Sequence, residues 1–237
     1  MTQRTYRNWI EDKDLLSFVV KEGESDLFIR ADKDLSCRAR QSICRQRSLI
    51  QEYIKKHPEF AGSLEPLAVE QKAPGIVKDM SEAGFAAGVG PMAAVAGAVA
   101  EYVGRDLLEY SKEVIIENGG DIFIKTDKTR KIGIFAGKSC YTGKLALEIP
   151  EGSLGICASS GTVGHSLSYG KADAAVAVCP SAILADAWAT RIGNMVGGPQ
   201  DIEKTLDFIK NKPAIEGLII VVGDKIGVWG KIKLIRS

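Results

Sequence analysis

The chain has 237 residues, enough for one large hydrophobic core, with 45% hydrophobic and 26% charged residues. These proportions are typical of a folded globular protein and exclude a disordered or fibrous chain. The formal net charge is +1, from 31 basic and 30 acidic side chains. Because no general positive field would gather nucleic acid or anionic lipid, we expect neither nucleic acid nor a membrane as partner, and any anion must bind locally.

Cysteine usage and the N-terminus indicate the compartment. The odd number of cysteines, the absence of a Cys-x-x-Cys pair and the presence of only two histidines argue against a disulfide framework and a structural zinc site. Residues 1–13 lack the apolar core and cleavage site of a secretory signal. We therefore predict a cytoplasmic protein. The cysteines are Cys37, Cys44, Cys140, Cys157 and Cys179.

The first predicted elements are a hairpin and a long helix. Two β-rich runs between Leu15 and Ala31 flank a turn at Gly23. Apolar residues at helical spacing then predict a helix from Asp34 to Lys56, ended by Pro58. No aromatic residues interleave with its arginines, which favours a solvated face over a nucleic-acid patch. These arginines are Arg38, Arg40, Arg45 and Arg47.

An unusual apolar run follows a connector at residues 62–74. From Ala83 to Ala100 there are eighteen consecutive uncharged residues, the length of a membrane span. Most of them are alanine, glycine and other small residues, with few large aliphatics, and Gly88-Val89-Gly90-Pro91 should interrupt a helix. The pattern predicts two buried helices that meet at a glycine loop.

The second half of the chain is rich in strands. Glycines punctuate the junctions between six predicted strands, which run over Glu113–Glu117, Asp121–Lys125, Lys131–Ala136, Lys144–Ile149, Leu154–Ala158 and Ala174–Cys179. Two helices follow, Ser181–Met195 and Gln200–Lys210, and then a terminal hairpin of Gly217–Val222 and Lys225–Trp229. Because the strands arrive in runs, we predict one domain over residues 1–237, an α/β fold of the α+β type with mixed, largely antiparallel sheets and packed helices.

The first candidate for a ligand site is the glycine loop. Gly88 and Gly90 would allow close approach of a ligand to the backbone, and Pro91 suits the first turn of a helix whose free N–H groups bind anions. Met92 and Ala93 follow directly. The alternative interpretation is that these glycines only permit tight helix packing.

The second candidate is the turn from Glu117 to Asp121. Its simplest interpretation is a hairpin, because Asn118-Gly119 and Gly120-Asp121 are strong turn signals. The turn also gathers three polar side chains, Glu117, Asn118 and Asp121, which could hold a ribose, an amide or a metal.

The third candidate is the loop from Ala158 to Ser166, which follows an apolar strand. Its hydroxyls and backbone amides could donate to phosphate oxygens, and it contains one of the two histidines, His165. The loop lacks the Gly-x-Ser-x-Gly pattern of a serine hydrolase. Asp173 could orient the imidazole of His165 for proton transfer. The ligand-binding candidates are Ser159, Ser160, Gly161 and Thr162.

The fourth candidate lies in the predicted helix after Ser181. Asp186 and Thr190 are four residues apart and share a helical face, so a carboxylate and a hydroxyl could offer oxygen ligands to Mg²⁺. The alternative interpretation is an aspartate favoured by the dipole at the start of its own helix. Cys140, in a polar loop, is a candidate reactive thiol or an incidental cysteine.

Taken in order, these motifs resemble the ApbE superfamily, and the resemblance covers about Pro74 to Asn194. Asn118-Gly119-Gly120-Asp121 is similar to the family's asparagine-glycine-glycine-aspartate turn, and Ser159-Ser160-Gly161 to its serine-glycine loop. Ala185-Asp186-Ala187-Trp188-Ala189-Thr190 is similar to its alanine-aspartate-alanine-x-alanine-threonine helix. The resemblance implies an ApbE-like, T-fold-like fold. Two longer phrases, from Gly88 to Gly97 and from Ser159 to Ser166, resemble a cytoplasmic ApbE-like branch of archaea and anaerobic bacteria.

The family's best-known members transfer FMN from FAD to a protein threonine with Mg²⁺. The resemblance implies that Asp186, Thr190 and the backbone carbonyl of Ala93 bind Mg²⁺, and that FAD or a related nucleotide is the ligand. This chain has Ala94 or a neighbour where the transferases have a lysine, and His165-Ser166-Leu167-Ser168 where they have a histidine-isoleucine-x-aspartate-proline phrase. These departures, and the missing export signal, argue against protein flavinylation.

Two functions remain open at this point. One is an Mg²⁺-dependent site for a flavin or other nucleotide diphosphate that transfers a nucleotidyl or phosphoryl group. The other, implied by the resemblance to the archaeal branch, is a non-flavinylating accessory protein of anaerobic sulfur assimilation, from sulfide to homocysteine, in which Cys140 or another thiol matters. A homodimer is also expected, because alanine-rich helices and sheet edges need to be covered.

Overall fold

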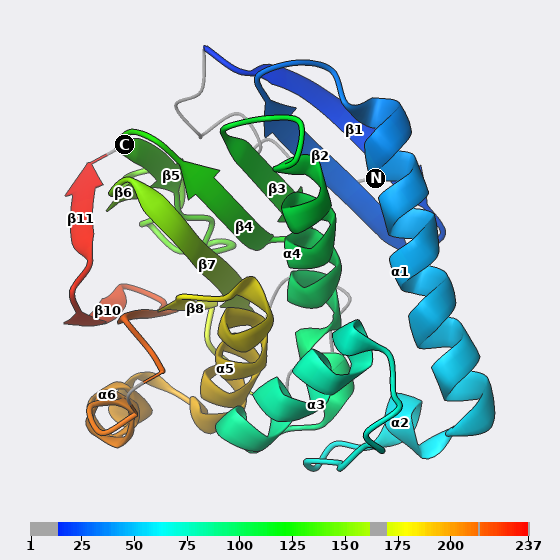
Figure 1. Cartoon of the computed structure of the whole chain (residues 1–237). Coiled ribbons are helices and arrows are strands. Elements are labelled where there is room, and N and C mark those ends of the chain that lie inside the picture. The colour runs from blue at the N-terminus through cyan, green and yellow to red at the C-terminus, as the bar shows by residue number, and fades with distance from the viewer. Residues whose placement is uncertain (1–13, 162–169, 213, 237) are drawn as a thin grey trace.

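The computed structural model describes residues 14–161, 170–212 and 214–236, and its central feature is an eight-stranded sheet (Figure 1). The strand order is β1-β2-β3-β4-β7-β8-β9-β10, and every pairing in it is antiparallel. The strands are β1 Leu16–Glu22, β2 Ser25–Ala31, β3 Val114–Asn118, β4 Asp121–Thr126, β7 Gly152–Ser159, β8 Ala174–Cys179, β9 Gly217–Val222 and β10 Lys225–Gly230. The predicted antiparallel α+β arrangement is confirmed.

A smaller sheet packs on one face of the large one. Its order is β11-β6-β5, again antiparallel, with β5 Arg130–Gly133, β6 Leu145–Ile149 and β11 Lys233–Arg236. Ile132, Leu147 and Ile149 from this sheet share a buried cluster with Ile115 and Ile124 of the large sheet. The side-chain alternation of β3 explains this arrangement, because Ile115 faces the small sheet whereas Val114 and Ile116 face the helices.

The helices cover the opposite face of the large sheet (Figure 1). They are α1 Ser36–Lys56, α2 Glu59–Gly62, α3 Gly75–Ala87, α4 Val95–Leu107, α5 Ala182–Met195 and α6 Ile202–Ile209, with short 3-10 turns η2 Pro91–Ala94 and η3 Pro199–Asp201. Alanines of the uncharged run, such as Ala83, Ala94, Ala98 and Ala100, are buried, so much of this run packs in the core. No single described helix is long and apolar enough to span a membrane, although α3 and the η2–α4 segment, bent by 104°, meet the length and composition criteria together.

The break between α3 and α4 lies where the sequence predicts it. α3 ends at Gly88, which has a left-handed φ of 71° and whose N–H donates to Gly84 O at 2.8 Å. Only glycine adopts this conformation without strain, and Pro91 then starts η2. Both predicted helices are confirmed, but only α4 is largely buried, because α3 leaves Phe85 55% exposed.

One predicted strand is clearly shorter in the structure, and two short elements were not predicted. The predicted strand Lys131–Ala136 is the shorter β5, because the chain turns after it and Ser139 N donates to Ala136 O. The sequence interpretation had no helix at α2 and no strand at β11. Both are four residues long, too short for periodicity to reveal them.

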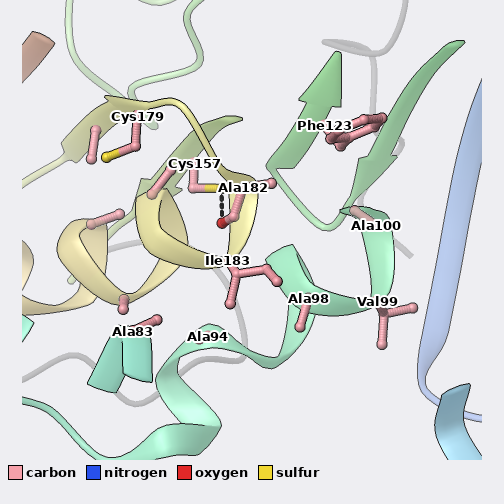
Figure 2. Packing of buried hydrophobic residues seen from close by; sticks show 14 of the residues in the cluster. Ala83, Ala94, Ala98, Val99, Ala100, Phe123, Cys157, Cys179, Ala182 and Ile183 are labelled. Atoms are coloured by element: carbon pink, nitrogen blue, oxygen red, sulfur yellow. Dashed lines mark hydrogen bonds between the residues drawn. The ribbon is translucent and has the colours of Figure 1, made fainter. Parts of the chain in front are cut away.

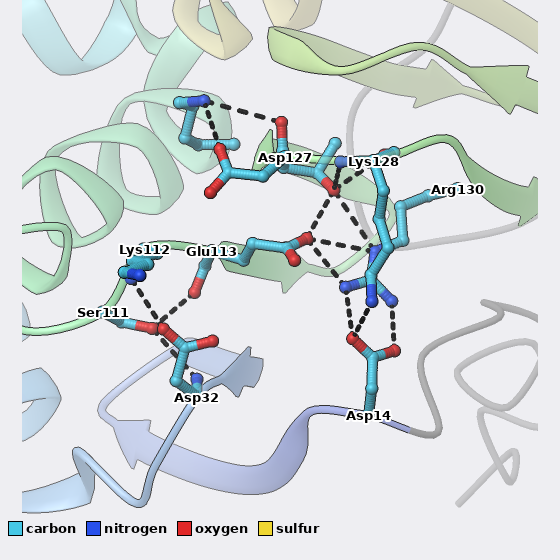
Figure 3. Close-up of polar contacts among 10 residues, drawn as sticks. Asp14, Asp32, Ser111, Lys112, Glu113, Asp127, Lys128 and Arg130 are labelled. Atoms are coloured by element: carbon cyan, nitrogen blue, oxygen red, sulfur yellow. Dashed lines mark hydrogen bonds and ion pairs between the residues drawn. The ribbon is translucent and has the colours of Figure 1, made fainter.

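A polar cluster joins the start of β1 to the strands β3, β4 and β5 (Figure 3). The Arg130 side chain is 2% exposed, and its guanidinium donates to both Asp14 carboxylate oxygens, at 2.7 and 3.0 Å, and to Glu113 Oε2 at 2.7 Å. Thr126 Oγ1 also donates to Glu113, and Lys128 Nζ lies 2.6 Å from Asp14. The charge of a buried arginine is therefore matched by two carboxylates.

Candidate functional site

The four predicted motifs lie on elements that contact one another. α5, which carries Asp186, packs against η2, α4, β4 and β7. These elements, or their ends, carry the glycine loop, the Asn118–Asp121 turn and the serine-glycine loop. The fold therefore brings together the ends of segments that are far apart in the sequence.

Asp186 binds the N-terminal turn of α4. It is the fifth residue of α5 and is 9% exposed, and its Oδ2 accepts a hydrogen bond from Gly97 N at 2.8 Å. A Cβ on Gly97 would lie 2.2 Å from Ala182 O, so the close approach of the two helices requires glycine here. The alternative interpretation, a carboxylate at the start of its own helix, is wrong, because no acidic residue lies in the first turn of α5. A helix N-terminus is a favourable place for negative charge, and the one that Asp186 uses belongs to α4.

Glu101 makes the reverse contact from α4 to α5. Its side chain is nearly fully buried, and Oε2 accepts hydrogen bonds from Ala182 N at 2.7 Å, Ile183 N at 3.2 Å and Ser181 Oγ at 2.7 Å. The other oxygen accepts from Arg105. Sequence reasoning treated Glu101 only as the end of an uncharged run. A carboxylate directly after six uncharged residues at the start of α4 was the signal that could have identified it.

The Asn118–Asp121 turn is a two-residue hairpin, as predicted. Asn118 pairs with Asp121, and Gly119 and Gly120 have φ of 70° and 117°, values that favour glycine. Glu117 Oε1 accepts from Gly120 N at 2.9 Å. Asn118 is buried and donates from Nδ2 to Ala96 O at 3.0 Å, so the turn is attached to the first turn of α4.

Asp121, a partly exposed residue whose Oδ1 is buried, interacts through its charge with the buried Asp186. Burial, and then the charge of Asp186, raises the pKa of Asp121 well above its usual range. Hydrogen bonds from the Cys157 side chain and the Ala158 N–H act in the opposite direction. Burial raises the pKa of Asp186 to about 7, against backbone hydrogen bonds from Gly97 and Ala96. Asp121 Oδ1 is buried without a hydrogen-bond partner in the described part of the chain. The pair is therefore a site that favours a proton or a cation.

Cys157 lies in the packed region where α5 begins (Figure 2). Its Sγ lies 3.3 Å from Ala182 O, so its one S–H can donate either there or to Asp121. Burial, followed by the charges of Asp121 and Asp186, raises the pKa of this thiol strongly. Burial also raises the pKa of Cys179. Cys140 and Cys37 are exposed, so the candidate thiol of the polar loop is accessible.

The glycine loop is shaped by packing against the connector. Gly90 is buried, and a Cβ there would lie 1.8 Å from Ser63 O, so chain packing alone requires this glycine. Gly88 is exposed, Pro91 is buried, and Met92 and Ala93 are partly exposed. Tight packing therefore explains Gly90. Gly88, which is exposed, is still open to the interpretation that a ligand approaches the backbone.

The serine-glycine loop begins at the end of β7. Ser159 is buried, Ser160 is partly exposed, and Gly161 N donates to Ala172 O at 2.9 Å. Thr162 and His165 lie outside the described residues. Asp173, expected to orient His165, is partly exposed, and its Oδ2 accepts from Gly223 N at 2.7 Å. Asp173 therefore also ties the β9–β10 turn to the start of β8.

The chemistry of the donor atoms suits a hard cation. Thr190 follows Asp186 by one helical turn and is half-buried, so the available groups are carboxylate, hydroxyl and backbone carbonyl oxygens. Within the described ranges, no group of three or more His, Cys, Asp or Glu side chains could hold a metal. These oxygen groups fit a cation that is bound by no more than two carboxylates. Backbone carbonyls, water or a ligand would complete its coordination shell.

The overall arrangement is similar to solved structures of flavin transferases. A mutant form of the flavin transferase ApbE from Vibrio cholerae superposes with a TM-score of 0.57 at 14% identity, covering 91% of this chain and 97% of that one. The flavinyl transferase ApbE of Pseudomonas stutzeri gives 0.56 at 13% identity, covering 91% and 93%. At these identities the likeness establishes the fold.

Sequence relatives define the family more closely. Residues 7–209 match the protein-family model described as "AbpE bacteria", so the chain belongs to this ApbE-like family. A UPF0280 protein of Methanococcus aeolicus is 43% identical over 217 residues, covering 88% of each chain. A UPF0280 protein of Methanocaldococcus jannaschii is 40% identical over 217 residues, also covering 88% of each chain. The resemblance stated from the motifs is confirmed.

Proposed function

We propose that this protein binds a flavin or another nucleotide diphosphate together with Mg²⁺, where α4, α5 and the β3–β4 turn meet. The observation that carries the proposal is the buried Asp121 Oδ1, which has no hydrogen-bond partner among the described residues and belongs to a carboxyl group that interacts with the charge of Asp186. Like charges in a buried site are costly unless a proton or a cation compensates them.

The cation ligands in this proposal are the Asp186 carboxylate, the Thr190 hydroxyl and the backbone carbonyl of Ala93. Mg²⁺ prefers six oxygen ligands and usually keeps waters or substrate phosphates among them. When bound, it would neutralise negative charge that develops on a transferred phosphoryl or nucleotidyl group. Asp186 keeps one oxygen on Gly97 N, which fixes the direction of the other.

The ligand would lie against three backbone segments. The exposed backbone at Gly88 and the partly exposed Met92 border the first segment, and the N-terminal turn of α4 favours an anion. Asn118 holds this turn through Ala96 O, and Ser159 ends the strand beside it. The full set of ligand-binding residues in the proposal is Gly88, Gly90, Pro91, Met92, Glu117, Asn118, Gly119, Gly120, Asp121, Ser159, Ser160, Gly161 and Thr162.

A group-transfer activity is the further part of the proposal. His165 would accept the proton of an attacking hydroxyl while a new P–O bond forms and the bond to the leaving phosphate breaks, with Asp173 orienting the imidazole. The names of the structural neighbours, flavin transferase and flavinyl transferase, support a flavin as the ligand to test first. This chain lacks the lysine and the histidine phrase of the flavin transferases. The proposal therefore includes an acceptor other than the protein threonine used in flavinylation.

Titration calorimetry tests the binding. The purified protein is titrated with FAD, FMN and ADP, each with and without Mg²⁺, and Asp186→Asn is compared with Asp207→Asn. Asp207 is an exposed aspartate of α6 and provides the matched loss of one carboxylate. Binding that requires Mg²⁺ and fails only in Asp186→Asn supports the proposal, whereas no binding of any of the three nucleotides contradicts it.

A further inference from the structure

Helices α4 and α5 cap each other with the same spacing. In α4, Gly97 donates its N–H and Glu101, four residues later, supplies a carboxylate. In α5, Ala182 donates its N–H and Asp186, four residues later, supplies a carboxylate. Each helix therefore satisfies free N–H groups of its partner's first turn, in addition to the Ser181 side chain that accepts from Leu184 N.

The two contacts are geometrically coupled because the helices touch between them. A Cβ on Gly97 would lie 2.2 Å from Ala182 O and 2.9 Å from Asp186 Cβ. The first turn of α5 also packs closely against β7, since a Cβ on Gly155 would lie 2.3 Å from Ala182 N. The first turn of α5 has little room to shift unless its hydrogen bonds to Glu101 are lost.

We infer that Glu101 is a positioning residue for the cation site, which holds the first turn of α5 and thereby sets the location of Asp186. The inference rests on the proposed function, since it assigns Glu101 a role toward the same cation. Glu101 is not a ligand itself. One of its oxygens accepts from Ala182 N, Ile183 N and Ser181 Oγ, and the other accepts from Arg105.

The surroundings of Glu101 hold its carboxylate in a fixed orientation. Arg105 pairs with Glu101 one turn along α4, lies 3.7 Å from Asp79 of α3 and stacks over the Tyr102 ring at 5.2 Å. Tyr102 in turn donates to Asp79 at 2.8 Å. The carboxylate is therefore held from α3 and α4 while it binds α5, as expected of a group that fixes another element.

The test compares Glu101→Gln with Ser181→Ala. Glutamine keeps the size of the side chain but replaces one acceptor oxygen with an NH₂ donor, so either the N–H groups of α5 or Arg105 would face a donor instead of an acceptor. Alanine at 181 weakens the cap of the same helix turn and leaves the Glu101 carboxylate on Ala182 and Ile183. Glu101→Asp keeps the carboxylate on a shorter side chain, so it should change both measurements less than Glu101→Gln does.

Two measurements are made on each folded variant, well below its unfolding midpoint. The first is hydrogen exchange of the Gly97 amide, which reports the Asp186 contact without any ligand. In Glu101→Gln it should exchange roughly tenfold faster, the change produced by the loss of one hydrogen bond. The second is the apparent Kd for Mg²⁺ in the presence of FAD, which should rise about tenfold or more, as for removal of a group that orients a metal ligand.

The outcomes separate this inference from the proposed function. If wild-type protein binds neither Mg²⁺ nor FAD, the proposed function fails, and with it the role of Glu101 toward a cation. If wild-type protein binds both, but Gly97 exchange or the Mg²⁺ affinity changes equally in Ser181→Ala and Glu101→Gln, Glu101 is only a helix-stabilising residue and the inference is overturned. Should Glu101→Gln not fold, the same comparison is made with Glu101→Asp.

Discussion

Asp121 and Asp186 interact through their charges: burial, and then the negative charge of Asp186, raises the pKa of Asp121. Asp121 comes from the start of β4 and Asp186 from α5, so the hairpin turn and the helix must both be in place for the pair to form. The charges of these two carboxyl groups repel each other when both are ionised. Such repulsion is typical of functional sites and is relieved by a bound cation.

Ligand-dependent stabilisation should follow from this pair. We predict that FAD with Mg²⁺, each at about 100 times its Kd, stabilises the wild-type protein by at least about 2.7 kcal/mol, and that Asp186→Asn loses most of this gain. Thermal unfolding with and without Mg²⁺ measures it. Asp207→Asn, the matched control, should keep the full shift, and equal shifts in the two variants would exclude Asp186 as a cation ligand.

The contact between α4 and α5 should not tolerate a methyl group. Gly97→Ala would place Cβ against the Ala182 carbonyl, and we predict a loss of about 1–3 kcal/mol in the free energy of unfolding. Gly62→Ala is the control, because Gly62 is exposed and its Cβ would meet nothing within 4 Å. Urea denaturation of the two variants gives the comparison. A Gly97→Ala protein as stable as Gly62→Ala would show that the helices can separate freely.

Arg130 should be essential to stability, because it compensates two carboxylates (Figure 3). Replacing it with methionine leaves Glu113, whose side chain is 10% exposed, without its cation, and we expect a loss of about 3–5 kcal/mol. Lys128→Met removes a half-exposed partner of Asp14 and should change stability by less than about 1 kcal/mol. Chemical denaturation near neutral pH measures both, and similar small losses would show that the buried pair contributes little.

The same cluster predicts a pH dependence. Hydrogen bonds from Arg130 and then Lys128 hold the pKa of Asp14 well below its usual range, despite a side chain that is 44% exposed. A carboxyl group with a lowered folded-state pKa contributes stability above its unfolded-state pKa, near 4, and loses that contribution as the pH falls. Asp14→Asn should therefore destabilise the protein at pH 7, with a difference from wild type that shrinks below about pH 4. A difference that is constant between pH 3 and pH 7 would contradict this assignment.

The cysteines provide a test of thiol burial and a test that separates the two functional hypotheses. Cys37 and Cys140 are exposed, whereas Cys157 and Cys179 are buried with raised pKa values, so an alkylating reagent should label the first two in the native protein and the last two only after unfolding. In a deletion strain, Cys140→Ser should complement as well as wild type, and Asp186→Asn should not. The opposite result would favour the sulfur-assimilation alternative over a cation site.

Much of the fold could be predicted because its local signals agree. The glycine-proline break between α3 and α4, the Asn118–Asp121 hairpin and the small-residue pattern of α5 each have a local physical cause. The strand β11 could not be predicted, because its four residues, Lys-Leu-Ile-Arg, are ordered by pairing with β6, a distant segment.

The site was less accessible to sequence reasoning for the same reason. Asp186 and Asn118 could be selected from their motifs, but their partners, Gly97 N and Ala96 O, are backbone groups that only the tertiary structure identifies. Glu101 carries no motif of its own, and its importance depends on the first turn of α5 lying beside it. Sequence reasoning finds side chains with chemical character, whereas the groups that hold them are found in the packing.

The mutual capping of α4 and α5 has a consequence for how the protein folds. The two hydrogen bonds join residues 89 and 81 positions apart in the chain, and several strands of the large sheet lie between them. Closing loops of this length has an entropic cost, so we expect these contacts to form late, after the intervening chain has been ordered. In a partly folded molecule, α4 and α5 could form without their mutual hydrogen bonds, and the site would be incomplete. Ligand binding during refolding would therefore report the final step of folding.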